Sequence, residues 1–449
     1  LGRREVIGRF DGGRITSDGG GLLLREVDKR LGLLDRLAAC FINYRNPNAI
    51  EHSVAALIAQ RVYGLALGYE DLNDHDVLRK DSVLALLVGK QDLTGEARVR
   101  DQDRGNPLAA SNTLNRLELS TPASAAKDRY KRIAADPDAL DRLLVDVFLE
   151  SYRQPPREIW LDLDATDDPL HGHQEGRFFH GYYDHYCYLP LYVFCGRHLL
   201  VSYLRSSKID PAKHSWAILS LLVKALRLHW PKVEIIFRGD SGFCRWKLLR
   251  WCERHDVRYI VGLARNTRLQ RVSRKWTTLA EEQYRATGRK QRVFASVTYA
   301  ALTWDRSRRV IVKAEHSAHG ANPRYVITNL PQGDQYLYDK LYCARGDMEN
   351  RIKDQQLDLF AGRASCHRWW PNQYRQLLSG LAYTLFEALR RRALHDTALA
   401  NASPNRIRLT LLKIGAVIIR NTRRIRILMS SACPHQDLFR TVAWRLNSS

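Results

Sequence analysis

Two aspartates stand where strands of an expected α/β sheet end. The stretch IIFRGDSGF (235–243) closes an apolar run with Asp240, and the alternating stretch REIWLDLDAT (157–166) reaches Asp164. The ends of neighbouring strands form the crevice of such a sheet, so the two carboxylates are expected to meet there. They would repel one another unless a divalent cation lay between them. Mg²⁺ takes oxygen ligands, and two such ions clamp the oxygens of a phosphodiester exchange.

A third carboxylate is expected on a helix farther along the chain. In YCARGDMENRIK, Tyr342, Arg345, Glu349 and Lys353 are spaced by three, four and four positions. This spacing places all four side chains on one helix face. The acid suits a metal, and the cations beside it suit DNA phosphates. Arg238, two positions before the second aspartate, is a further candidate for phosphate contact.

Each of these acids has a simpler alternative role. Asp240 could cap the short turn that follows it, alone or in addition to holding a metal. Glu349 could be a solvated acid on a salt-bridged helix, with Asp347 as its nearest rival. We favour Asp164 as the strand-end acid over its neighbours Asp162, Asp167 and Asp168.

A histidine- and tyrosine-rich segment follows the first aspartate. Its histidines are His171, His173, His180 and His185. Zinc is one hypothesis, but no cysteine or histidine pair elsewhere completes a familiar ligand spacing. The favoured interpretation is a loop beside the site that touches DNA through Arg177, His180 and its tyrosines. Such aromatic rings can stack on unpaired bases near a cut end.

Hydrophobic periodicity divides the chain into five parts. Residues 1–150 are mostly helical, and 151–265 alternate strands and helices as a mixed α/β sheet requires. We expect a β-rich insertion without a long helix over 266–335, and two long helices over 336–400. The tail, 401–449, is basic and is expected to form a β-hairpin that turns near Asn421.

Charge indicates the kind of partner. The chain has 449 residues, with 71 Lys plus Arg against 48 Asp plus Glu and a formal charge of +23. This length predicts two or three domains. The surplus of positive charge indicates an anionic partner, most plausibly nucleic acid, with a membrane surface as the other candidate. No run of about eighteen apolar residues exists, so no bilayer-spanning segment is expected. We expect a cytoplasmic protein whose eight cysteines are reduced and mostly in the core.

Five motifs together give the chain a family resemblance. They are LDLDATDDP, GYYDHYCYLPLYVFCG, FRGDSGF, YIVGLARN and MENRIKDQQLDLFAGR. The combination resembles the DDE transposases of bacterial insertion sequences, most closely insertion-sequence family 1380. The likeness runs from FDGGRITSDGGG near the start to HQDLFR near the end, which is nearly the whole chain.

The resemblance implies a fold and a set of site residues. The catalytic domain would be RNase H-like, split into 151–265 and 336–400, with Asp164, Asp240 and Glu349 as its acids. A β-strand insertion is implied between the last two acids, where 349 − 240 leaves 109 positions. Related transposases carry a lysine two turns after the glutamate, but Gln356 stands there. Lys353, one turn after the glutamate, is the candidate for that role.

The function implied is transposition. The helical N-terminal region would bind the terminal inverted repeats, and the core would cut double-stranded DNA and join it to target DNA. Two Mg²⁺ ions would serve, with Mn²⁺ as a substitute, and a homodimer on DNA would hold both ends together. No membrane role is expected. Two alternatives stay open: a DNA-binding remnant without catalysis, and a metal-dependent nuclease or phosphatase that never joins strands.

Overall fold

The computed structural model describes residues 5–129 and 132–448. Internal contacts divide the chain into two compact units. One unit is Leu144–Lys353, and the other combines Leu1–Leu143 with Asp354–Ser449. The chain therefore leaves its first unit and returns to it at Asp354. The second part of the expected core, 336–400, is shared between the two units at this boundary.

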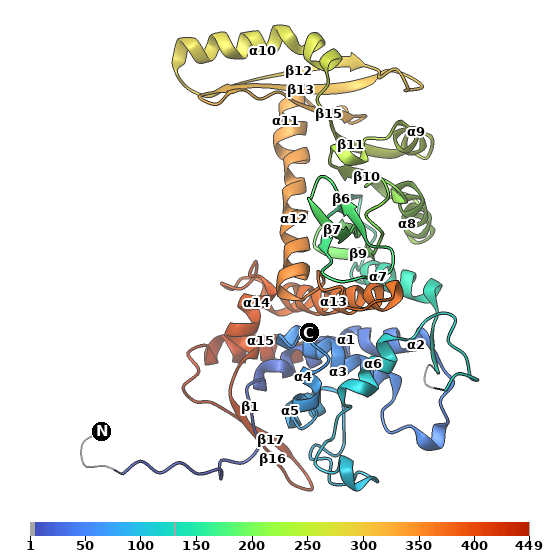
Figure 1. Cartoon of the computed structure of the whole chain (residues 1–449). Coiled ribbons are helices and arrows are strands. Elements are labelled where there is room, and N and C mark those ends of the chain that lie inside the picture. The colour runs from blue at the N-terminus through green and yellow to red at the C-terminus, as the bar shows by residue number, and fades with distance from the viewer. Residues whose placement is uncertain (1–4, 130–131, 449) are drawn as a thin grey trace. The chain divides into compact units, whose positions relative to one another are not determined.

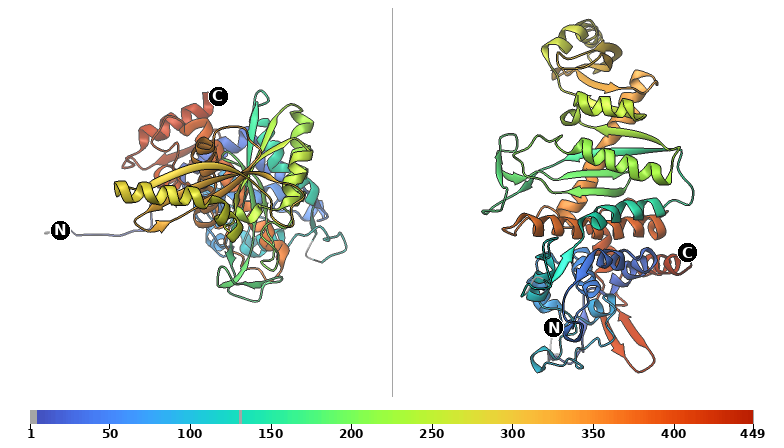
Figure 2. Two further views of the ribbon diagram at one scale, coloured as in Figure 1. Left: turned by 90° about the horizontal axis from the view of Figure 1, so that it is seen from above. Right: turned by 90° about the vertical axis from the view of Figure 1, so that its right-hand side faces the viewer.

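The unit Leu144–Lys353 is built on one twisted sheet of mixed direction. Its strands run in the order β12-β13-β15-β11-β10-β4-β8-β9, and β14 pairs with β13. The bounds are β4 Glu158–Ala165, β8 Leu191–Cys195, β9 His198–Tyr203, β10 Glu234–Gly239, β11 Val257–Leu263, β12 Gln291–Tyr299, β13 Arg308–Ser317, β14 Gly320–Ala321 and β15 Arg324–Thr328. Seen from above, the strands cross at successive angles, which is the twist expected of such sheets (Figure 2). The expected mixed α/β class is confirmed.

Helices cover both faces of the central strands. Helices α8 (Ser215–His229) and α9 (Trp246–Arg254) lie on one side, and a long helix lies on the other (Figure 1). This long helix runs from α11 (Asp334–Tyr336) through a π-helical turn and a 3₁₀ turn to α12 (Gly346–Lys353). The predicted alternation of 157–166 is confirmed, because one set of its side chains joins the core under α8. That set is Ile159, Leu161 and Leu163.

The expected strand-rich insertion contains a long helix that the prediction missed. Helix α10 (Thr267–Thr287) packs on β12 and β13, and its buried side chains include only Leu269, Ser273 and Ala280. So few apolar positions leave a weak helical period in the sequence. The strands that follow are not a separate sheet. They continue the central one, because β15 pairs antiparallel with β11.

A small three-stranded sheet leaves the central sheet directly after β4. Its order is β5-β7-β6, with β5 at Asp168–Pro169, β6 at Phe178–His180 and β7 at His185–Tyr188. Residues 177–188 form its outer hairpin. The chain then returns to the central sheet through β8, which pairs with β4.

The other unit is mainly helical, as predicted for most of 1–150. Its main helices are α1 Leu22–Leu31, α2 Leu33–Ala39, α3 Val54–Leu67, α4 Asp74–Leu78, α5 Ser82–Leu87, α6 Ser111–Glu118, α7 Pro137–Glu150, α13 Trp369–Leu389, α14 Pro404–Ile407 and α15 Gln436–Ser448, with α7 crossing into the next unit. Helix α3 packs against α13, and both are buried almost all round. Glu118, which is buried in this helical core, forms ion pairs with both Arg61 and Arg375.

The remaining strands of this unit are short. Strands β2 (Phe41–Asn43) and β3 (Ile133–Ala135) pair with one another, and β1 (Ile15–Thr16) pairs with β16 (Ala416–Arg420). Strand β17 (Ile425–Met429) completes a hairpin that turns through Asn421, as predicted, but the rest of the tail is largely helical, with helical turns over 404–412 and α15 after the hairpin. Within the described residues, no helix is both long and apolar enough to span a bilayer.

Candidate active site

The two strand-end aspartates lie at the same edge of the central sheet. Strands β4 and β10 are parallel neighbours, and Gly239 pairs with Leu163 in their register. The next residue on each strand is therefore Asp240 and Asp164. The Asp240 side chain accepts a hydrogen bond of 2.9 Å from the Gly242 backbone amide and so caps the turn Ser241–Phe243. The predicted cap exists, and it uses one carboxylate oxygen.

A glycine on the next strand makes room for this turn. Gly262 lies on β11, which pairs with β10 on the other side from β4. A Cβ atom there would lie 2.6 Å from the Tyr342 hydroxyl and 2.8 Å from the Ser241 amide nitrogen. Both distances are below any normal contact, so a larger residue would push the Asp240 turn and Tyr342 apart. The close approach of these groups explains the glycine.

Arg345 joins two of the three predicted acids. Its Nη1 donates to Asp164 Oδ2 at 3.0 Å, and its Nη2 donates to Glu349 Oε1 at 2.7 Å. Arg345 and Glu349 are four residues apart, which is the neighbour spacing of a helix. The Arg345 side chain is 18% exposed, whereas that of Glu349 is 49% exposed. One guanidinium thus holds the helix acid beside the end of β4.

Burial and mutual repulsion dominate the electrostatics of this edge. Burial raises the pKa of Asp164 to about 6; Arg345 opposes the rise, and the charges of Asp240 and Glu349 add to it. Burial disfavours the charge of Arg345, but the carboxylates of Asp164 and Glu349 outweigh it and raise the pKa of the guanidinium. The charges of Asp240 and Glu349 thus disfavour a charged Asp164, and the positive charge of Arg345 favours it.

Asp162, the rival on the same strand, has a structural partner. Both Asp162 and Arg238 are buried, and Arg238 Nη2 donates to Asp162 Oδ2 at 2.8 Å. Arg238 Nη1 also donates to the Leu341 carbonyl on the long helix, and the guanidinium lies 5.2 Å from the Trp160 ring. A buried and fully engaged arginine is poorly placed to meet a phosphate. We therefore withdraw Arg238 from the predicted DNA contacts and assign it to positioning the long helix.

The donor chemistry of the edge suits a hard divalent cation, but Arg345 engages two of the acids. Asp164, Asp240 and Glu349 offer carboxylate oxygens only, which are the ligands that Mg²⁺ prefers. In residues 5–129 and 132–448, no three His, Cys, Asp or Glu side chains are grouped so that they could hold a metal ion. A cation held here would compete with Arg345 for the carboxylates of Asp164 and Glu349.

The same finding bears on the zinc hypothesis for the histidine-rich segment. His185 bonds Asp167 at 2.9 Å instead of joining a ligand group. Asp168 is buried, and burial followed by the charge of Asp167 raises its pKa to about 8. Of the two rivals of Asp164 on this segment, Asp167 thus bonds His185 and Asp168 lies in the interior. The sequence-based zinc alternative has no ligand group among the described residues.

The other predicted contact residues are dispersed. Lys353 ends α12 with an exposed side chain, outside the group joined by Arg345. Tyr342 lies beside the Asp240 turn, where burial raises the pKa of its hydroxyl. Arg177 stacks on the Tyr186 ring at 4.5 Å. Four residues were predicted to share one helix face. The structure brings together two of them, Arg345 and Glu349, and places Tyr342 on the neighbouring turn.

A row of cations on α10 was missed by sequence reasoning. Arg268, Arg271, Arg274 and Lys275 are all exposed, and Arg265 precedes the helix. Residues 265–275 contain no acid, so the stretch is a purely positive surface. The signal was present as cations at intervals of three and four. The expectation of a β-rich insertion without a long helix over 266–335 gave these cations no common helix face.

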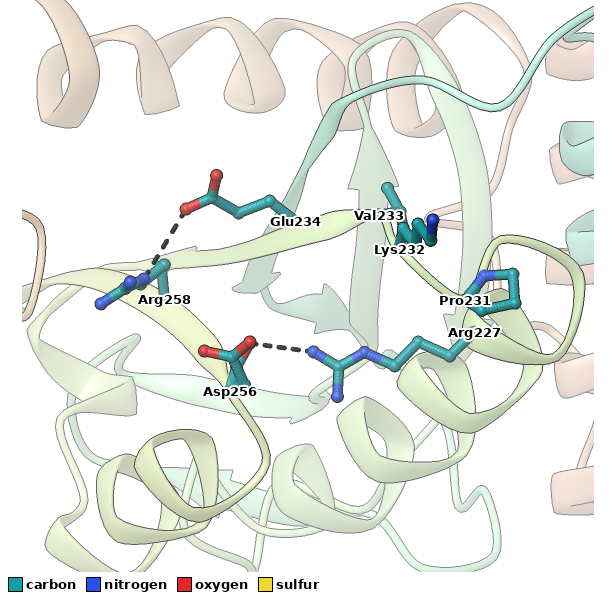
Figure 3. A pocket seen from close by; sticks show the side chains of 7 residues that line it. All are labelled: Arg227, Pro231, Lys232, Val233, Glu234, Asp256 and Arg258. Atoms are coloured by element: carbon teal, nitrogen blue, oxygen red, sulfur yellow. Dashed lines mark hydrogen bonds and ion pairs between the residues drawn. The ribbon is translucent and has the colours of Figure 1, made fainter.

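A hollow lies at the opposite end of the same strands. It is lined by Arg227, Pro231, Lys232, Val233, Glu234, Asp256 and Arg258 (Figure 3). Glu234 begins β10, whereas Asp240 follows its end. The polar groups are satisfied locally: Glu234 pairs with Arg258 at 3.6 Å, and Arg227 donates to the Asp256 carbonyl at 2.9 Å. We assign this hollow no part in the candidate site.

The fold and the site define a mixed α/β protein with carboxylates at the ends of two neighbouring strands. A comparison with protein-family models identifies the family. The model of the family Transposase DDE domain group 1 matches residues 1–449, so the chain belongs to this family. The expectation of a DDE transposase is thereby confirmed. No curated protein matches the chain. Among solved structures, the chain is similar to the piggyBac transposase synaptic complex with hairpin DNA, at 11% identity, covering 89% of this chain and 81% of that one with a TM-score of 0.42.

Proposed function

We propose that the protein cuts and joins DNA as the transposase of an insertion sequence, with Asp164, Asp240 and Glu349 as its acids. The observation that carries the proposal is the register of β4 and β10, which brings two aspartates to one strand edge beside the Arg345–Glu349 pair. Membership of the DDE family supports the same choice. Assignment to insertion-sequence family 1380, a bacterial origin and an RNase H-like core are parts of this proposal.

The reaction is a pair of phosphoryl transfers. Water first attacks a phosphodiester at the end of the element, and the 3′ oxygen leaves as a hydroxyl. That 3′ hydroxyl then attacks a second phosphodiester, forming one bond as the other breaks. No covalent link to the protein is needed. Divalent cations held by the three acids would activate the attacking oxygen and stabilise the leaving oxygen when bound.

The chain's own residues contribute charge and position. Arg345, once released from a carboxylate, can donate to a DNA phosphate as a bidentate pair. Tyr342, fixed beside the Asp240 turn, can hydrogen-bond a neighbouring phosphate oxygen. Lys353 and Arg177 would add phosphate contacts farther from the acids. Arg238 holds the long helix that carries Arg345 and Glu349.

The affinity for Mn²⁺, a spectroscopic substitute for Mg²⁺, is expected to rise with pH up to about 6 and then level off. Below the Asp164 pKa of about 6 the cation must displace a proton, so affinity should fall by roughly tenfold per pH unit. Above it the carboxylate is already charged. Titration of the DNA-free protein followed by electron paramagnetic resonance measures this directly. The Asp164→Asn variant should bind Mn²⁺ more weakly, and its affinity should not depend on pH in this range. An Mn²⁺ affinity independent of pH in the parent protein would contradict the assignment of Asp164 as a metal ligand.

The cations of α10 are proposed to lie along the DNA backbone. Neutralising a phosphate releases a counterion, so each contact contributes about 0.9 to the slope of log affinity against log salt. Replacing Arg268, Arg271 and Arg274 by glutamine should therefore lower that slope by up to roughly 2.7 on duplex DNA. Replacing Arg285, an exposed arginine of the same helix paired with Glu281, is the matched control and should change it little. An unchanged slope in the triple variant would remove α10 from the interface.

The remaining parts are assigned to recognition and assembly. We propose that the helical region of residues 1–150 binds the terminal inverted repeats and that the basic tail, 401–449, contacts phosphates. The insertion, 266–335, would guide the DNA end to the core parts, 151–265 and 336–400. Bringing both ends together calls for a homodimer on DNA.

The proposed function is tested with DNA that carries the sequences flanking the gene, labelled at one end. Incubation with the purified protein and Mg²⁺ should cut at one defined terminal position. A pre-cut end should then be inserted into target DNA. Tight binding without cleavage, even with Mn²⁺, would favour the DNA-binding remnant. Cleavage without insertion of the pre-cut end would favour a nuclease.

A further inference from the structure

The hairpin of residues 177–188, here called the aromatic hairpin, exposes an unusual number of rings. Phe178 is 43% exposed, Phe179 44%, Tyr182 86% and Tyr186 43%. All four belong to one short hairpin made by β6 and β7 (Figure 1). Exposed apolar side chains are ordinary when scattered singly, but a contiguous group indicates a binding surface.

One face of the aromatic hairpin is built as a platform. Phe179 lies directly opposite Tyr186, and their rings pack edge to face at 5.5 Å. The Arg177 guanidinium lies 4.5 Å from the Tyr186 ring on the same face. At the tip, Tyr182 packs edge to face on Tyr183 at 5.0 Å. The face thus combines aromatic surfaces with one cation.

The other face anchors the aromatic hairpin to the unit. Cys187 is buried, and His185 bonds Asp167 at 2.9 Å. Ser207 donates to the Phe178 carbonyl at 2.9 Å. Because these contacts fix the hairpin, its exposed rings need little further ordering to bind a ligand.

The aromatic hairpin lies beside the acids of the candidate site. Strand β5, which pairs with β7, begins four residues after Asp164. The charge of Asp164 also reaches Tyr183: burial, then Asp167, then Asp164 raise the pKa of its hydroxyl to about 12. A DNA strand at the acids would therefore have its next nucleotides within reach of the rings.

We infer that the aromatic hairpin binds an unpaired nucleotide at the cut end, with a base stacked on Tyr182 or on the Phe179–Tyr186 face. A base in a duplex has both faces covered by its neighbours, whereas an unpaired base leaves them open to aromatic rings. Arg177 is placed to meet the phosphate of the same nucleotide. The inference rests on the proposed function, because it takes DNA at the acids as given.

The test compares two DNA duplexes in the absence of metal. One ends blunt, and the other carries a short single-stranded overhang with 2-aminopurine, a fluorescent adenine analogue, at the first unpaired position. The full chain should quench this fluorescence on binding. Tyr182→Ala and Phe179→Ala should reduce the quenching and weaken the overhang duplex by roughly 5- to 100-fold, since each stacked base is worth a few kcal/mol. Binding of the blunt duplex should stay unchanged.

Two further variants make the result specific. Tyr182→Phe keeps the ring and should behave like the parent protein. Trp216→Ala removes a ring that is 55% exposed on α8 and should have no effect on either duplex. Tyr182 is almost fully exposed, so its loss should leave folding intact.

Three outcomes would overturn the inference. Equal loss on both duplexes would make the hairpin a general backbone contact, and no loss on either would remove it from the interface. A change in oligomeric state of the DNA-free Tyr182→Ala protein would identify a second copy of the chain as the occupant. Failure of the proposed function is distinguishable, because stacking is measured without metal or cleavage. Overhang-specific quenching in a protein that never cuts DNA would leave the hairpin assignment standing and refute the catalytic one.

Discussion

Replacing Asp240 by asparagine is expected to abolish DNA cleavage while DNA binding survives. Asparagine keeps the size of the side chain and the oxygen that caps the Gly242 amide, so the turn should persist. It removes the negative charge that would hold a cation at the strand edge. Losing a carboxylate that holds a catalytic metal removes several kcal/mol of transition-state stabilisation, which is roughly a thousandfold or more in rate. Cleavage of end-labelled DNA and a parallel binding titration measure both properties.

The helix acid offers a matched comparison. Glu349→Gln should have the same effect on cleavage as Asp240→Asn, because it keeps an oxygen that can accept from Arg345 and removes the charge. Asp347→Asn is the control, because Asp347 lies on the same helix with a side chain that is 71% exposed. It should cut DNA at the parental rate. Parental cleavage by either Asp240→Asn or Glu349→Gln, or loss of cleavage in Asp347→Asn, would refute the assignment of the acids.

The central strands could be predicted because their side chains alternate. In β4 the apolar set faces the core under α8, and the opposite set carries Asp162 and Asp164 toward the long helix. That pattern places a carboxylate at the strand end. It does not say which of the two aspartates forms a structural ion pair and which is left for the site. That depends on Arg238, which pairs with Asp162 from 76 positions away in the chain. Only the parallel pairing of β4 with β10 decides it.

The long helix was predicted in type but not in its details. A regular helix would align Tyr342, Arg345, Glu349 and Lys353 on one face. The structure instead has a π-helical turn over Leu337–Tyr342 and a 3₁₀ turn over Cys343–Arg345. These turns change the rotation per residue, so spacing alone could not place the four side chains. Cys343, expected in the core, is exposed on this stretch.

The bond between Arg345 and Asp164 could not be predicted from the sequence either. A face of Tyr, Arg, Glu and Lys predicts partners on its own helix, and the i,i+4 pair of Arg345 with Glu349 is such a partner. The second bond crosses 181 positions to the end of β4. It places one positive charge between two of the three acids and so offsets part of their repulsion. This explains how the edge can be stable without a cation and why metal binding has to compete with Arg345.

Replacing Arg238 by methionine is expected to destabilise the unit Leu144–Lys353 more than any other single change in its ion pairs. The substitution leaves the buried Asp162 carboxylate without its partner and removes the donor to the Leu341 carbonyl. Breaking a buried pair by removing one member typically costs about 3–5 kcal/mol. Hydrogen exchange of peptides from β4 and β10, followed by mass spectrometry, should show faster exchange by a factor of hundreds or more.

The effect of Arg238→Met should grow with pH. Burial already raises the pKa of Asp162, with Arg238 opposing the rise, so loss of the arginine raises it further. A carboxyl whose folded pKa is raised stays protonated and uncharged at low pH, and the cost of burying its charge appears as pH rises through that pKa. Destabilisation should therefore be larger at pH 8 than at pH 5. A pH-independent loss would mean that packing, and not the unpaired charge, is responsible.

Two comparisons separate the ion pair from the arginine's bulk. The double variant Asp162→Leu with Arg238→Met removes both charges and should recover most of the loss, because replacing a whole buried pair by apolar groups is often neutral. The bond to the Leu341 carbonyl stays lost, so a deficit of about 1 kcal/mol should remain. Arg258→Met breaks an exposed pair with Glu234 on the neighbouring strands and should cost at most about 1 kcal/mol. If Arg238→Met were as mild as Arg258→Met, the buried pair would not be what holds the long helix against the sheet.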